Sequence, residues 1–116
     1  MSAICLIDTR IFLNILNVPN RNQDKAQVLD EFKEYIELDV TFILPMATVL
    51  ETGNHIAQNG DGHLRRKTAQ RFCEMVKGAL TGKAPWQLRE FPNSQNILGR
   101  ISAIKKIHQY CIIIKE

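Results

Sequence analysis

The chain has 116 residues, of which 45% are hydrophobic and 23% charged, and its formal net charge is +3 at pH 7. This length suits one domain with a real core, and the composition is typical of a soluble globular protein. No apolar stretch approaches the roughly 20 residues of a membrane-spanning helix, and the N-terminus lacks the features of a signal peptide. The three cysteines show no CxxC spacing, so we expect no zinc site or disulfide framework, and a reducing, cytoplasmic setting.

The charges are distributed unevenly along the chain. Residues 1–60 carry eight acidic and four basic residues, whereas residues 61–116 carry four acidic and eleven basic ones. A basic half favours a polyanionic partner such as RNA, because bound phosphates release their counterions. The alternative is a solvated basic surface without a partner.

A short apolar run at residues 4–7 is the first expected strand. Such a run fits a strand that is buried on both faces, as in parallel sheets. It ends in Asp8, which Thr9 follows. A carboxylate at the carboxyl end of a central parallel strand points into the crevice where α/β proteins bind ligands. The alternative is that Asp8 or Thr9 caps the helix expected over about 9–17.

Helical and strand patterns then alternate along the chain. The remaining expected elements are helices over about 23–38, 46–58, 63–80 and 96–110, and strands over 41–44, 86–91 and 111–114. This alternation predicts a single α/β domain with a parallel sheet.

The helix over about 46–58 carries a second notable carboxylate, Glu51. We expect one stripe of this helix to be apolar, formed by Met46, Val49, Leu50, Gly53 and Ala57. Glu51 lies at the edge of that stripe, and Asn54 is its neighbour one turn later. In a parallel sheet, Asp8 and Glu51 reach the same crevice and form an anionic pocket for a hard cation, Mg²⁺ or Mn²⁺. Such an ion activates water and assists phosphodiester displacement.

The first turns of the helix over about 63–80 are strongly basic. They carry Arg65, Arg66, Lys67 and Arg71. Positive charge at the start of a helix opposes the helix dipole, so these residues do not serve helix stability. They either bind RNA phosphates or form a solvated face.

The stretches LIDTRIFLNIL and FILPMATVLETGNHI together resemble the PIN-domain family of metal-dependent ribonucleases, over about residues 3–80. The resemblance implies a three-layer α/β/α fold with a central parallel sheet. It implies that Asp8 is the first metal ligand and catalytic acid, that Glu51 is the second, and that Thr9 supports the site. We expect Asn54, as the helix neighbour of Glu51, to support it too. It also implies RNA as substrate and, as in toxin–antitoxin pairs, an antitoxin-like protein partner.

The chain departs from the family pattern in two places. Arg10 follows Asp8 and Thr9 where members often have a small polar residue, and its guanidinium can pair with Asp8 or hold a phosphate. No aspartate follows Asp61, although the family places one or two in its last third. We therefore expect one domain over 1–116, truncated or altered in its C-terminal third, with impaired ribonuclease activity. The alternatives are a non-catalytic module that binds RNA or self-associates as a homodimer, and a truncated product without a separate function.

Overall fold

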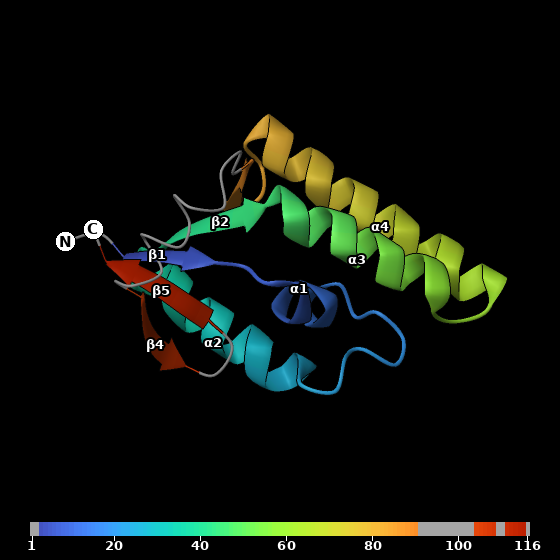
Figure 1. The fold of residues 1–116 in the computed structure, drawn as a ribbon, viewed down its shortest axis with the longest axis horizontal. Helices are drawn as coiled ribbons and strands as arrows, with labels where there is room; N and C mark the ends of the chain where they lie inside the picture. The colour runs from blue at the N-terminus through green and yellow to red at the C-terminus, as the bar shows by residue number, and fades with distance from the viewer. Residues whose placement is uncertain (1–2, 91–103, 109–110, 116) are drawn as a thin grey trace.

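The structure is a computed structural model and describes residues 3–90, 104–108 and 111–115 (Figure 1). The order of its elements is β1 (Ala3–Leu6), α1 (Thr9–Ile15), α2 (Lys25–Glu37), β2 (Thr41–Pro45), α3 (Met46–Gln58), α4 (Gly62–Thr81), β3 (Trp86–Arg89), β4 (Ile104–His108) and β5 (Cys111–Lys115). The predicted mixed α/β class is confirmed. From β1 to β3, the element ends lie within two residues of those expected from the sequence.

The strands form one five-stranded sheet of order β3-β2-β1-β5-β4. Strands β1, β2 and β3 are parallel, and their register places Cys5, Phe42 and Trp86 side by side. Strand β5 pairs with β1 in the antiparallel direction, and β4 pairs with β5 in the same way. The expected parallel sheet is therefore confirmed for β1, β2 and β3 and wrong for β5, the strand expected over 111–114. Only two residues separate β4 from β5 in sequence, which is too short for the crossover that a parallel pair requires, so these two strands are antiparallel.

The helix expected over 96–110 is also wrong where the structure describes this stretch. Residues 104–108 form β4, whereas residues 96–103 and 109–110 lie outside the described part of the chain. Isoleucines at helical spacing suggested the helix. Isoleucine is β-branched and fits a strand at least as well, and the neighbouring strand β5 supplies the hydrogen-bonding partner.

The three parallel strands are buried mainly on one face. The buried residues of its parallel strands alternate along the chain and are Cys5, Ile7, Phe42, Leu44 and Trp86. The residues between them are partly buried or exposed, so the expected burial of β1 on both faces is not seen. Helices α1, α2 and α4 supply aromatic side chains to the buried face. Examples are the edge-to-face contact of Phe12 with Trp86 and the contact of Phe32 with Phe42.

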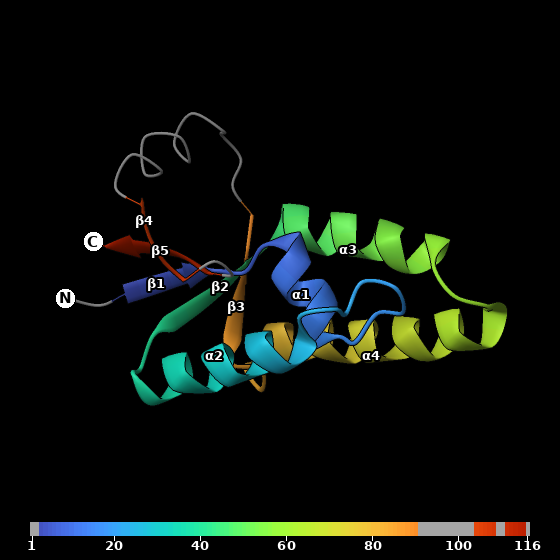
Figure 2. The same cartoon turned by 90° about the horizontal axis from the view of Figure 1, so that it is seen from below.

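Helices α3 and α4 pack against each other and extend beyond the sheet (Figures 1 and 2). The face of α3 that is buried carries Thr48, Thr52 and Ile56. The apolar stripe expected from the sequence is therefore confirmed only in part: Val49 packs against the core, whereas Leu50 is 64% exposed. On this buried face, the hydroxyl of Thr48 donates to the carbonyl of Ile7, the residue that follows β1. Among the described residues, no helix is both long and apolar enough to cross a membrane.

Candidate functional site

Asp8 lies between the end of β1 and the start of α1. Its Oδ1 accepts a hydrogen bond of 2.9 Å from the backbone N–H of Ile11, and its own backbone is extended. Asp8 is therefore the N-cap of α1, and the capping interpretation is confirmed. The side chain is exposed to solvent. Because capping engages one carboxylate oxygen, it is compatible with cation binding through the other.

Two hydrogen bonds join α3 to the residues on either side of Asp8. Thr9 Oγ1 donates to Glu51 Oε2 at 2.5 Å, and Thr48 Oγ1 donates to the carbonyl oxygen of Ile7 at 2.9 Å. Thr9 and Ile7 are the two residues that flank Asp8 in the chain. Glu51 therefore lies at the start of α1, bonded to the residue that follows Asp8, although 42 residues separate it from Thr9.

The oxygen atoms at this point are those a hard divalent cation prefers. Asp8 and Glu51 supply carboxylates, both exposed, and Asn54 is exposed one turn further along α3. Within the described ranges, no group of three or more His, Cys, Asp or Glu side chains is placed to hold a metal ion. Two carboxylates leave most of a cation's coordination shell to water, so an ion held by this pair alone is bound weakly.

Arg10 forms an ion pair with Asp24, a partner that the sequence did not predict. Its Nη2 donates to Asp24 Oδ2 at 2.7 Å, and its side chain is 66% exposed. Such an exposed ion pair contributes little stability. The buried Asn14 supports it by accepting from the Asp24 N–H at 3.0 Å and donating to the Arg10 carbonyl at 2.9 Å. A lone asparagine inside the apolar run IFLNIL is the sequence signal that marks this buried link.

The four basic residues expected to bind RNA have different surroundings. Arg66 and Lys67 are exposed near the start of α4, and the Nε of Arg65 donates to the Gly60 carbonyl at 3.2 Å. Arg71 instead donates to the carbonyls of Leu16 and Asn17, at 3.1 and 3.3 Å. These carbonyls follow the last turn of α1, where backbone oxygens lack partners within the helix. Arg71 thus joins α4 to the end of α1, a structural role that the sequence analysis missed.

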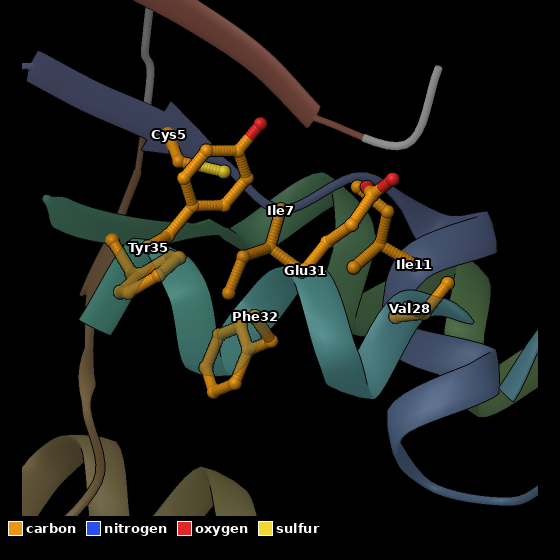
Figure 3. Close-up of a pocket in the computed structure, with 8 residues that line it drawn as sticks. Cys5, Ile7, Ile11, Val28, Glu31, Phe32 and Tyr35 are labelled. Atoms are coloured by element: carbon orange, nitrogen blue, oxygen red, sulfur yellow. The ribbon is translucent and has the colours of Figure 1, made fainter. Parts of the chain in front are cut away.

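A small cavity lies between β1 and α2 (Figure 3). Its volume is about 10 Å³, and its polar lining residues are Glu31 and Tyr35. Burial raises the pKa of Tyr35 to about 12, with smaller contributions from the negative charges of Glu31 and Glu34. The cavity has room for about one water molecule. It is therefore not a second candidate for a substrate site.

Comparison with other proteins does not assign a family to the chain. No model of a known protein family matches it, and comparisons with curated proteins and with solved structures also found no match. A function is therefore inferred from the chain's own residues and contacts.

Proposed function

We propose that this chain is a PIN-like ribonuclease domain that binds one Mg²⁺ or Mn²⁺ weakly at Asp8 and Glu51 and has little or no activity by itself. The observation that supports this most directly is the Thr9–Glu51 hydrogen bond, which brings the second carboxylate to the residue next to Asp8. RNA as the ligand, an antitoxin-like partner, a cytoplasmic setting and a three-layer α/β/α arrangement are parts of the same proposal.

In this proposal the chain's own residues hold and orient the cation. Asp8 and Glu51 provide carboxylate oxygens, and the Thr9 hydroxyl donates a hydrogen bond to Glu51. The cation, when bound, supplies an activated water and stabilises negative charge during phosphodiester cleavage. Activity is low because the sequence has no aspartate after Asp61 to complete the pocket. Loss of such a group typically lowers metal affinity or activity about 10–100-fold.

Manganese titration calorimetry tests the site. Asp8→Asn is the informative variant, because an asparagine oxygen still accepts the capping bond from Ile11. Asp61→Asn is its matched control, since Asp61 caps α4 in the same way, with Oδ1 2.9 Å from the Leu64 nitrogen. We expect Asp8→Asn combined with Glu51→Gln to abolish weak Mn²⁺ binding, and Asp61→Asn to leave it unchanged. Identical titrations for the double variant and the parent would exclude a shared site.

A fluorogenic RNA assay tests activity. In Mg²⁺ or Mn²⁺, we expect cleavage by the purified chain at or near background. Robust cleavage that Asp8→Asn abolishes would contradict the expected low activity. It would indicate that Glu90, Glu116 or a second chain completes the site.

The second candidate function is a non-catalytic RNA-binding module of the same fold, which the exposed Arg66 and Lys67 favour. It predicts that RNA affinity is the same for the parent and for the variant lacking both carboxylates. It also predicts that affinity falls steeply with salt, and less steeply once Arg66 and Lys67 are replaced by serine. Sedimentation of the purified chain tests the alternative of a self-associating homodimer.

A further inference from the structure

Two threonine hydroxyls join α3 to the chain on either side of Asp8. Thr48, which is 6% exposed, donates to the carbonyl of Ile7, and Thr9 donates to the carboxylate of Glu51. The two bonds differ in their surroundings. The bond of Thr48 is buried, whereas the bond of Thr9 to Glu51 is exposed to water.

The bond of Thr48 attaches α3 to a rigid point of the fold. Ile7 is fully buried, and its N–H donates to the carbonyl of Ile43 at 2.9 Å, so its backbone is held against the middle of β2. The hydrogen bond to the Ile7 carbonyl therefore limits how far α3 can slide along its axis or turn about it, relative to the end of β1. Thr48 and Glu51 are three residues apart and therefore lie on the same side of α3.

The exposed Glu51 carboxylate depends on this attachment. A long, solvated side chain has several rotamers, and an exposed hydrogen bond alone selects among them only weakly. Once Thr48 has set the helix, Glu51 faces the start of α1, and the Thr9 hydroxyl is within 2.5 Å.

We propose that Thr48 is a positioning residue for the carboxylate pair, acting through the Ile7 carbonyl to place Glu51 beside Asp8. This inference rests on the proposed function and deepens it. It assigns to Thr48 a role in cation affinity as well as in stability.

A matched control lies one turn further along the same helix. Thr52 is fully buried, and its hydroxyl has no hydrogen-bonding partner among the described residues. Thr52→Val removes a buried hydroxyl from α3 without removing an attachment to β1. Thr48→Val removes the attachment and keeps the side-chain shape, whereas Thr48→Ser keeps the hydroxyl.

The first measurement is a Mn²⁺ titration of the parent and the three variants. We expect Thr48→Val to weaken binding by about 10–100-fold, the range for groups that orient metal ligands. Thr48→Ser is expected to stay within about threefold of the parent, and Thr52→Val to match it. Unchanged binding by Thr48→Val, or an equal loss in Thr52→Val, would overturn the positioning role.

The second measurement needs no metal, so it tests the positioning role of Thr48 even if the parent binds no Mn²⁺. It is a double-mutant cycle of Thr48→Val and Thr9→Val, with urea unfolding followed by Trp86 fluorescence. If Thr48 positions Glu51, Thr48→Val also loosens the Thr9–Glu51 bond. The effect of the double variant on the unfolding constant then differs by about threefold or more from the product of the two single effects. Additive effects would overturn the role of Thr48. Absence of Mn²⁺ binding by the parent, together with non-additive effects, would refute the metal site alone.

Discussion

Replacement of Arg71 by methionine separates the structural role of this residue from its predicted role in RNA binding. In the structure, its guanidinium donates to the carbonyls of Leu16 and Asn17 at the end of α1 and to Thr68 Oγ1. A cation at this position also interacts favourably with the helix dipole. Methionine keeps most of the apolar stem and removes only the charge and the donors.

The contacts allow an estimate of the loss. A hydrogen bond from a charged donor contributes about 1.5–3 kcal/mol. We take the lower end for the carbonyl of the buried Leu16 and little for that of the exposed Asn17, because Arg71 is only partly buried. The expected loss in the free energy of unfolding is therefore about 2 kcal/mol, or about 30-fold in the unfolding constant. With a urea m-value of about 1.5 kcal/mol per molar, the midpoint falls by about 1.3 M.

Urea unfolding followed by fluorescence measures this loss directly. Trp86 is the only tryptophan and is 5% exposed within the aromatic cluster, so its emission reports on the core. The matched control is Arg66→Met on the exposed face of α4, for which we expect a change below about 0.5 kcal/mol. An Arg71→Met midpoint equal to that of Arg66→Met would refute the structural role of Arg71.

Three further predictions concern charge, ionisation and backbone conformation. Replacement of Arg66 and Lys67 by serine is expected to flatten the salt dependence of RNA binding more than Arg71→Met does, because the Arg71 guanidinium already binds two carbonyls; equal slopes would contradict this. The pKa of Tyr35 is raised to about 12 in the folded chain, against 10.0 ordinarily, so the folded state retains a proton that the unfolded state loses. Stability should therefore fall by up to about 2–3 kcal/mol as pH rises from 10 to 12, and urea midpoints across this range should show a smaller fall for Tyr35→Phe. Gly60 and Gly82 both have positive φ, but only a Cβ at Gly60 would lie 3.3 Å from the Leu64 Cβ. Gly82→Ala should cost about 1 kcal/mol of unfolding free energy and Gly60→Ala more, and equal midpoints would contradict the crowding at Gly60.

The sequence by itself determined the order and the ends of the elements from β1 to β3. The starts of the helices depend on interactions between residues that are close in sequence. Asp8 and Asp61 each accept from the N–H three residues later and start α1 and α4, and Pro45 comes directly before α3. The same local patterns predicted that Asp8 and Glu51 lie at the same edge of the sheet, because each comes after one strand of the parallel pair β1 and β2.

Only the tertiary structure decided which side chains meet. Sequence patterns did not distinguish Arg71 from Arg66, because the partner of Arg71 is a carbonyl 55 residues away in the sequence. They also did not reveal that the buried face of α3 carries Thr48, which is bonded to a carbonyl 41 residues away. Residues 104–108 have a spacing that suits a helix, and they form a strand because β5 lies beside them. In each case the deciding interaction joins residues that are near each other only once the chain has folded, so no local pattern carries the information.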